Sequence, residues 1–297
     1  TLVNNSFGKI LRMTIFGASH AEELGVVIDG VPSGIRLCAA DFAKDLDRRR
    51  PHSRGETPRR EEDIPMIDGV DAEGITIGDR VTITFRNTNC KSGDYSHLVA
   101  HPRPSHADLT QRIKYGDEYN LAGGGMASGR MTVALVAAGV VAKKLLGGYH
   151  FETRIVSVGG SHNEAEFESI IADARAAGDS VGGVVECRAS GVERSLGEPF
   201  FDSAESVMSH LMFSIPGVKG VEFGDGFTGA GRHGSERNDM IVDDEGKTMT
   251  NNEGGINGGI SNGNDIVVRV AVKPTPSIAK AQQTYNFESN GVEELRI

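Results

Sequence analysis

The order of hydrophobic and polar residues along this chain follows two periods, one typical of strands and one typical of helices. Residues 81–86 alternate between apolar and polar side chains, which predicts a half-buried strand of an antiparallel sheet. Residues 39–49 carry Phe42 and Leu46 four positions apart, which predicts a helix. Further strands are predicted over 11–16, 25–29, 183–189 and 266–272, and further helices over 132–146, 164–177 and from a cap at Asp202 to about Phe213. Because strands and helices do not alternate regularly, the pattern favours an α+β fold in which antiparallel sheets cover buried helices.

The segment 132–146 is the most distinctive of these predicted elements. It is rich in Ala, Val and Leu on nearly every face up to Lys143 and Lys144, and Gly147 and Gly148 then end it. A helix that is apolar all round must be covered on all sides, so we expect this one inside the domain. The chain shows no internal repeat, low-complexity tract or linker, and residues 1–297 are predicted to form a single domain.

The composition is that of an ordinary globular protein and disfavours several classes. Of the 297 residues, 38% are hydrophobic and 24% are charged, and the net charge of −10 disfavours nucleic acid and anionic membranes as partners. The longest apolar stretch, residues 133–142, is too short to cross a membrane, and no signal segment is recognised at the start. The three cysteines lie far apart, which argues against a disulfide framework or a zinc site and favours a cytoplasmic location.

One segment runs against the acidic charge. Residues 48–60 contain six arginines and no lysine. The guanidinium group presents a rigid fork of donors that matches carboxylate and phosphate oxygens, so the cluster suits a small polyanion held in a pocket. The alternative is a solvated loop in which these arginines pair with Glu56, Glu61, Glu62 and Asp63.

Glycine-rich segments and two histidines supply further candidate chemistry. Residues 123–130 form a Gly-rich stretch before the long helix, where free backbone N–H groups, Ser128 and Arg130 predict a phosphate or carboxylate site. The alternative is a turn that only lets the helix pack closely. His20 and His106 lie in short, dense motifs; a histidine beside an arginine can donate a proton to a leaving anion, whereas a lone histidine is more often structural. No spacing of Cys, His and carboxylates predicts a metal site.

Two later segments are candidates for ligand contact. The glycines of residues 258–263 allow a backbone to approach a planar ligand closely. Residues 273–277 follow a predicted strand, and their two prolines fix the directions of a lysine and two hydroxyl side chains. This corner could hold a ring or a phosphate, or it could simply end an edge strand.

Taken together, these segments resemble the chorismate synthase family, in order along nearly the whole chain. The motifs that carry the resemblance include Phe16-Gly-Ala-Ser-His20, Arg48-Arg-Arg-Pro51, Arg103-Pro-Ser-His-Ala-Asp108, Gly258-Gly-Ile-Ser-Asn-Gly263 and Lys273-Pro-Thr-Pro-Ser277. No single motif is decisive, and it is their common order that carries the resemblance.

The resemblance implies a lyase of the shikimate pathway that converts 5-enolpyruvylshikimate-3-phosphate to chorismate and phosphate. This 1,4-anti elimination needs reduced FMN, although no net oxidation occurs. The resemblance also implies a β-α-β sandwich with helices between antiparallel sheets, assembled as a homotetramer. NADPH is the reductant expected in those family members that reduce their own flavin.

The resemblance also assigns site residues by position. His20 matches the family's histidine beside the departing phosphate, and His106 matches its histidine beside the flavin. The clamp for the phosphate and two carboxylates of the substrate would comprise Arg49, Arg50, Arg54, Arg103, Ser128 and Arg130. The FMN contacts would comprise Met126, Ala127, Ser128, Pro216, Gly217, Gly259, Lys273, Pro274, Thr275, Pro276 and Ser277.

The chain departs from the family pattern in several places. Ala18 and Ala21 replace a glutamate and a glycine around His20, which removes a carboxylate there, and Met126 removes one arginine. The sequence ends at Ile297, before an Arg-His-Asp segment with which family members continue, so we expect a divergent or C-terminally truncated member. Two other hypotheses stay open: a relative that binds flavin or an anionic metabolite without catalysis, and an arginine-loop module for RNA or an acidic partner.

Overall fold

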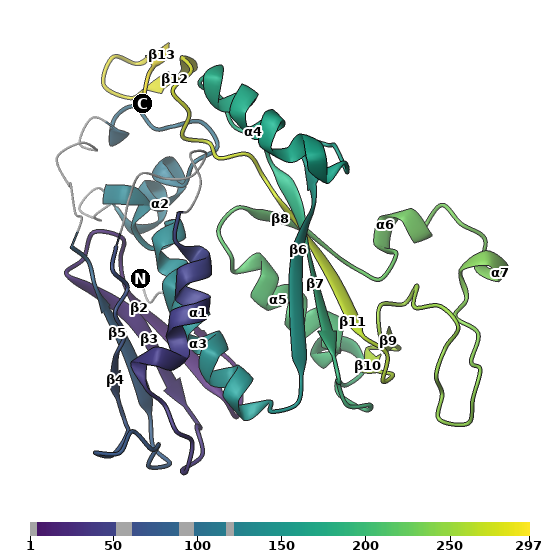
Figure 1. The fold of residues 1–297 in the computed structure, drawn as a ribbon. Coiled ribbons are helices and arrows are strands. Elements are labelled where there is room, and N and C mark those ends of the chain that lie inside the picture. Colours follow the sequence, from purple (N-terminus) through teal and green to yellow (C-terminus); the bar gives the residue numbers. More distant parts are fainter. Residues whose placement is uncertain (1–4, 52–60, 89–97, 117–121) are drawn as a thin grey trace. The chain divides into compact units, whose positions relative to one another are not determined.

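The computed structural model describes residues 5–51, 61–88, 98–116 and 122–297. The chain divides into two compact units, the first made of Thr1–Gly147 with Pro276–Ile297 and the second of Gly148–Thr275. Each unit combines helices with antiparallel sheets (Figure 1), which confirms the predicted α+β fold class. The single-domain organisation stays a prediction, and the two units are described separately.

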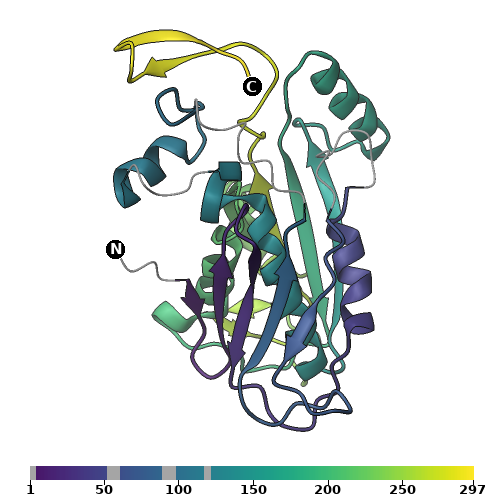
Figure 2. The same cartoon turned by 90° about the vertical axis from the view of Figure 1, so that its left-hand side faces the viewer.

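The first unit is built on a five-stranded antiparallel sheet with the strand order β1-β2-β3-β5-β4, whose strands run side by side in Figure 2. These strands are β1 (Ser6–Phe7), β2 (Arg12–Gly17), β3 (Glu23–Asp29), β4 (Met66–Asp68) and β5 (Val81–Arg86). The helices are α1 (Ala39–Arg49), α2 (Asp108–Tyr115), α3 (Thr132–Leu145) and the short 3₁₀ turns η2 (Ala122–Ala127) and η3 (Gly129–Met131). A hairpin of β12 (Gln282–Asn286) and β13 (Gly291–Leu295) belongs to the same unit.

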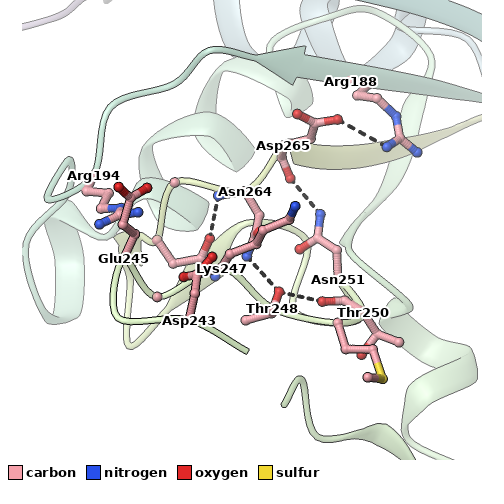
Figure 3. A pocket seen from close by; sticks show the side chains of 14 residues that line it. Arg188, Arg194, Asp243, Glu245, Lys247, Thr248, Thr250, Asn251, Asn264 and Asp265 are labelled. Carbon is pink, nitrogen blue, oxygen red and sulfur yellow. Dashed lines mark hydrogen bonds and ion pairs between the residues drawn. The ribbon is translucent and has the colours of Figure 1, made fainter. Parts of the chain in front are cut away.

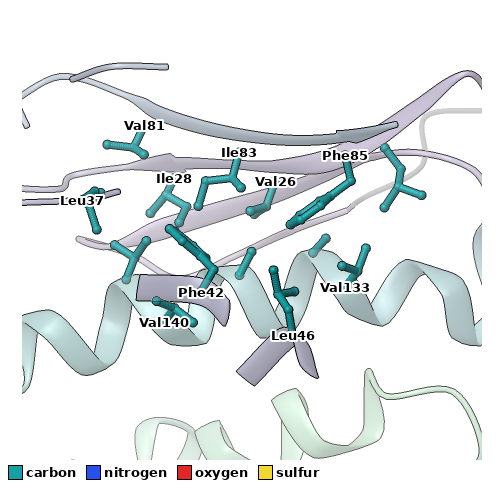
Figure 4. Close-up of a cluster of buried hydrophobic side chains, with 14 of the residues drawn as sticks. Val26, Ile28, Leu37, Phe42, Leu46, Val81, Ile83, Phe85, Val133 and Val140 are labelled. Carbon is teal, nitrogen blue, oxygen red and sulfur yellow. The ribbon is translucent and has the colours of Figure 1, made fainter. Parts of the chain in front are cut away.

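The core of this unit lies where α1 and α3 pack against the sheet (Figure 4). Its labelled side chains are Val26, Ile28, Leu37, Phe42, Leu46, Val81, Ile83, Phe85, Val133 and Val140, none of them more than 4% exposed. Burial of each Val, Leu, Ile or Phe side chain stabilises the fold by roughly 1.5–3 kcal/mol. The alternation predicted for β5 and the four-residue spacing predicted for α1 are therefore confirmed.

Helix α3 is buried along one stripe. Its buried side chains are Val133, Ala134, Ala137, Val140 and Val141, which recur at helical spacing. The other residues up to Ala142 are half-buried, and none of them is exposed. Lys143 and Lys144 are exposed and form ion pairs with Asp45 and Asp41 of α1. The predicted burial of α3 is thus complete on the stripe that faces the core and partial elsewhere.

The second unit contains a four-stranded antiparallel sheet with the order β6-β7-β11-β8. Its strands are β6 (His150–Val158), β7 (Gly183–Ser190), β8 (Val218–Phe223) and β11 (Ile266–Val272), with the short pair β9 (Ile256–Asn257) and β10 (Ile260–Ser261). Its helices are η4 (Glu164–Glu166), α4 (Phe167–Ala176), η5 (Phe200–Asp202), α5 (Ala204–Phe213), α6 (Gly226–Gly229) and α7 (Gly234–Arg237).

Helix α5 begins one residue later than the sequence pattern predicts. Asp202 belongs to the preceding 3₁₀ turn, and the cap is Ser203, whose Oγ accepts a hydrogen bond from the backbone N of Ser206 at 3.1 Å. The predicted cap at Asp202 is therefore wrong. Serine is a good N-terminal cap because its short hydroxyl side chain reaches the free N–H groups of the first helical turn.

Candidate functional site

The glycine-rich stretch forms a turn that precedes helix α3. Gly123, Gly124 and Gly125 have φ angles of 62°, 85° and 54°, in the left-handed region that favours glycine. Ser128 follows, and its Oγ accepts a hydrogen bond from the backbone N of Arg130 at 3.3 Å. Short turn η3 then leads directly into α3. The Gly-rich stretch thus precedes the long helix as the sequence predicts, with three left-handed glycines and a serine cap.

His20 lies against the first of these glycines. A Cβ atom built on Gly123 would lie 2.0 Å from Cε1 and 2.2 Å from Nδ1 of the His20 ring, so no larger residue fits there. The preceding residue, Ser19, is buried, and its backbone N donates to the carbonyl oxygen of Gly125 at 3.3 Å. This hydrogen bond joins the turn after β2 to the turn at Gly123–Gly125, which we call the glycine loop, and the imidazole of His20 contacts Gly123.

His106 lies against the next glycine. A Cβ on Gly124 would lie 3.4 Å from Cε1 and 3.8 Å from Nε2 of His106, and 3.6 Å from Cβ of Ser128. Adjacent glycines therefore contact the two histidines, which come from positions 86 residues apart in the sequence. The structure thus brings the two predicted catalytic histidines and Ser128 together around the glycine loop.

Arg103 and Asp108 fix the surroundings of His106. Asp108 is 3% exposed and accepts hydrogen bonds from the backbone N, Nε and Nη2 of Arg103 at 3.1, 2.8 and 2.7 Å. Its Oδ1 also lies 2.8 Å from Nδ1 of His106. Burial by itself raises the pKa of Asp108, but the hydrogen bonds from Arg103 and His106 outweigh burial and hold that pKa well below its usual range.

Arg103 also reaches the corner that follows the second unit's last strand. Its Nη1 donates to Oγ of Ser277 at 2.9 Å. Ser277 and Pro276 belong to the first unit, so this contact brings one predicted flavin contact beside the histidine cluster. The guanidinium of Arg103 is thus largely engaged by protein partners.

Two further predicted clamp residues share one carboxylate. Asp63, whose side chain is 1% exposed, accepts from Nη1 of Arg49 at 2.8 Å and from Nη1 of Arg130. The Arg130 side chain is itself 4% exposed. Among the residues that the structure describes, none accepts a hydrogen bond from the buried Nη2 of Arg130. This buried donor of Arg130 is available to an anionic oxygen.

Asn87, at the end of β5, links this arginine pair to the His20 turn. Its Oδ1 accepts from Nε of Arg130 at 2.9 Å, and its Nδ2 donates to the carbonyl oxygens of Ala18 and Ala21 at 3.3 and 2.7 Å. Sequence reasoning missed Asn87 and assigned Asp63 only to a solvated loop. The pairing of Asp63 with Arg49 agrees with that alternative, but its burial and its bond to Arg130 do not.

Among the described residues, the other site residues predicted in the first unit form no hydrogen bond or ion pair with the two histidines or with Asp63. Arg50 donates to the carbonyl oxygen of Glu62, and its side chain is 40% exposed. Met126 packs against the core, and Ala127 is exposed. Arg54 lies outside the described residues.

The second unit holds the other predicted flavin contacts. The backbone N of Lys273 donates to the carbonyl oxygen of Gly217 at 2.9 Å, which brings the Pro216–Gly217 turn beside the start of the proline corner. Ser180 donates to the carbonyl oxygen of Thr275 at 2.7 Å, and Pro274 and Thr275 are exposed. Close packing alone explains the glycine at position 259, because a Cβ there would lie 2.6 Å from Cβ of Ser203.

A cavity of about 500 Å³ also lies in the second unit (Figure 3). Its charged lining residues are Arg188, Arg194, Lys247, Asp243, Glu245 and Asp265, and Arg188 pairs with Asp265 at 3.3 Å. Three cationic and three acidic side chains give it no preference for an anion. None of the predicted site residues lines it.

Within the described part of the chain, no group of three or more His, Cys, Asp and Glu side chains could hold a metal ion. Within the same residues, no helix is long and apolar enough to cross a membrane.

Comparisons with known proteins identify the family. The sequence profile of the family described as chorismate synthase matches residues 11–297. The chain is 49% identical to a chorismate synthase of Chitinophaga pinensis over 99% of this chain and 88% of that protein, and 42% identical to one of Syntrophobacter fumaroxidans over 98% and 88%. A solved structure, "Crystal Structure of Chorismate Synthase", matches with a TM-score of 0.74 and 31% identity over 90% of this chain and 85% of that chain. The resemblance inferred from the sequence is confirmed.

Proposed function

Since the chain belongs to the chorismate synthase family, we propose that the cluster around its glycine loop carries out the elimination of phosphate from 5-enolpyruvylshikimate-3-phosphate to give chorismate. In this reaction the carbon–oxygen bond to phosphate and one carbon–hydrogen bond break, and a new double bond forms. A proton and inorganic phosphate are released, so no net oxidation or reduction occurs.

The observation that carries the proposal is a buried donor of Arg130 that has no acceptor among the described residues, on an arginine linked to the turn that carries His20. Arg49 and Arg130 share the single carboxylate of Asp63, and Nη2 of Arg130 is buried with no acceptor among the described residues. A buried donor without a partner costs about 1–3 kcal/mol, which an anionic oxygen of the substrate would offset. Asn87 ties the same arginine to the turn that carries His20.

We assign the phosphate end of the substrate to His20 and the two arginines. A protonated imidazole or a guanidinium group neutralises the charge that grows on the departing phosphate. Arg49, Arg130 and Ser128 orient the substrate, and Arg50 and Arg54 extend the clamp. Arg103 adds its charge and holds Ser277 and Asp108, since most of its donors already have partners.

The glycine loop fits a planar cofactor. Its residues have no side chains on the surface that meets His106, and Ser128 lies beside that surface. We therefore propose that reduced FMN is held by the backbone of residues 126–128 and by Ser277 and Pro276. The family resemblance gives Pro216, Gly217, Gly259 and Lys273–Thr275 as further flavin contacts. When bound, reduced flavin supplies electron density that stabilises the breaking carbon–oxygen bond. His106 lies close enough to the loop to hold a proton beside the ring.

Three further expectations stay proposals. NADPH is the reductant we expect if the enzyme reduces its own flavin. A homotetramer is supported by large apolar side chains on the second unit, where Phe200, Phe201 and Phe227 are 86%, 94% and 82% exposed and would be covered by subunit contacts. A cytoplasmic location rests on the cysteine pattern alone. Analytical ultracentrifugation of the purified protein tests the tetramer.

Chorismate formation tests the function directly. The purified protein is incubated anaerobically with reduced FMN and 5-enolpyruvylshikimate-3-phosphate, and chorismate is followed by its ultraviolet absorbance and phosphate by a colorimetric assay. We expect equal amounts of chorismate and phosphate. If the protein binds flavin or substrate but forms neither product, the non-catalytic relative is the correct description.

A further inference from the structure

We propose that Asp108 is a positioning residue for His106. Its carboxylate holds the proton of the neutral imidazole on Nδ1 and leaves Nε2 as the proton-exchanging atom toward the glycine loop. Nothing in the comparisons assigns a role to this carboxylate. Its effect on turnover rests on the proposed function, but its effect on the ring does not.

The contacts of Nδ1 decide between the two neutral forms of the ring. Nδ1 of His106 lies 2.8 Å from Oδ1 of Asp108 and 3.1 Å from Nη2 of Arg103. If Nδ1 carries the proton, it donates to the carboxylate at the shorter distance. If it does not, its lone pair faces a negatively charged oxygen at 2.8 Å. Because Nη2 of Arg103 already donates to the same Oδ1 at 2.7 Å, the protonated Nδ1 is the better arrangement.

The carboxylate is held so firmly that it can orient the ring. Asp108 is 3% exposed, and Arg103 binds it through the backbone N, Nε and Nη2. Arg103 and Asp108 are the charged groups that the described structure places within 3.2 Å of the imidazole. The carboxylate therefore cannot rotate away without breaking several charge-assisted hydrogen bonds.

The Cε1–Nε2 edge of the ring faces the loop. Cε1 and Nε2 of His106 lie 3.4 and 3.8 Å from the position that a Cβ on Gly124 would take. Because glycine has no such atom, this edge can approach a bound ring or substrate. A histidine that exchanges a proton at one nitrogen needs the other nitrogen fixed by a hydrogen bond.

A purely structural role for Asp108 gives different expectations. Asp108 is the first residue of α2, where a carboxylate stabilises a helix through the N-terminal partial charge, and its ion pair with Arg103 fastens the preceding segment. Either contribution changes stability. Neither determines which nitrogen of His106 carries the proton.

Asp108→Asn separates the two roles because the amide is isosteric with the carboxylate. Two donors of Arg103, its backbone N and Nε, face Oδ2 of Asp108. The single amide oxygen therefore stays at that position, and the NH₂ group turns toward His106, with loss of the one hydrogen bond from Nη2 of Arg103 to Oδ1. An NH₂ group donates to Nδ1, so the ring proton moves to Nε2. The analogous Asp→Asn change in the catalytic triad of serine proteases leaves the geometry intact and produces the wrong tautomer.

The first arm of the experiment needs neither flavin nor activity. Long-range ¹H–¹⁵N correlation spectra of the full chain labelled at its histidines report which nitrogen is protonated, and the His106 signals are those missing in His106→Gln. We expect the proton on Nδ1 in the wild-type protein and on Nε2 in Asp108→Asn. A wild-type ring protonated on Nε2 overturns the proposal without any variant, so failure of Asp108→Asn to fold does not leave it undecided.

The second arm measures turnover and flavin affinity. In Asp108→Asn we expect kcat to fall about 100- to 10,000-fold while the Kd for reduced FMN changes less than about threefold. The matched control is Glu168→Gln, an exposed carboxylate in the first turn of α4, for which kcat should stay unchanged. Equal tautomers in wild type and Asp108→Asn, or an unchanged kcat in an active enzyme, overturn the proposal. An inactive wild-type protein with the expected tautomers instead refutes the proposed function and leaves the role of Asp108 at the ring in place.

Discussion

Asp63 and Asp108 are both buried carboxylates that lie between two cationic or basic side chains, but the two clusters differ in the groups that the carboxylate joins. Asp63 joins Arg49 and Arg130, which are both permanently charged, and Nη2 of Arg130 has no acceptor among the described residues. Asp108 joins Arg103 and the titratable ring of His106, so that cluster is balanced when the ring is neutral. The first arrangement suits the binding of an anion, and the second suits the handling of a proton. A buried carboxylate shared by two basic side chains therefore serves two different purposes near the glycine loop.

Removing the titratable ring should have the largest effect. In His106→Ala we expect turnover to fall about 100- to 10,000-fold, as is typical of acid–base residues, while the affinity for FMN falls much less. Steady-state kinetics and a flavin titration measure the two quantities. If both fall by the same factor, His106 has a structural role in the flavin site, and the Asp108 cluster does not handle a proton.

Removing the carboxylate of the other cluster should mainly cost stability. Asp63→Asn leaves two guanidinium groups side by side in a buried position, and losing one partner of a buried ion pair costs about 3–5 kcal/mol. Urea denaturation measures this loss. The control is Asp47→Asn, whose side chain is 61% exposed and pairs with Arg50, and we expect a change below about 1 kcal/mol. Equal changes in the two variants would show that Asp63 is not buried as described.

The pH dependence of stability sharpens the description of Asp108. Because hydrogen bonds hold its folded-state pKa below the ordinary value of 3.8, the ionised carboxylate stabilises the fold fully above about pH 4. This stabilisation, of order 2 kcal/mol, is lost as the pH falls below 4 toward the lowered pKa. Urea denaturation of wild type and Asp108→Asn should therefore show a difference in the free energy of unfolding that shrinks below pH 4. A difference that stays constant down to pH 2 contradicts this account.

Truncating the more accessible arginine should give the smallest of these effects. The Arg49 side chain is 20% exposed, and Arg49→Ala should weaken binding of the substrate about 10- to 100-fold through loss of charge-assisted hydrogen bonds. Isothermal titration with 5-enolpyruvylshikimate-3-phosphate measures the affinity. Arg48→Ala, an exposed neighbour on the same helix, is the control, and we expect it to bind normally. An unchanged affinity in Arg49→Ala removes this residue from the clamp.

The sequence predicted most of the regular structure because local periodicity determines it. Helix α1 has the predicted bounds, and β5 shows the predicted alternation, since both bury one face against the same core. The cap of α5 was misplaced because Asp202 and Ser203 are both good caps, and only the backbone shows which of them reaches the helix.

The candidate site was predictable only where a motif carried it. His20, His106 and Arg103 lie in recognisable motifs, and Asp108 lies in the same motif as Arg103 without having been assigned a role. Asp63 stands among other acidic residues, and its burial depends on Arg130, which lies 67 residues later. No local pattern reports such a contact. The second-unit flavin contacts remain predictions for the same reason.

The glycine loop has a consequence for how the gene tolerates change. Any side chain at Gly123 would meet the His20 ring at about 2 Å on a backbone with φ of 62°, whereas a Cβ at Gly139 of α3 meets nothing within 4 Å. In a saturation library selected for growth without aromatic nutrients, codon 123 should therefore survive only as glycine. Codon 139 should accept alanine readily, because alanine also favours the helix by about 1 kcal/mol.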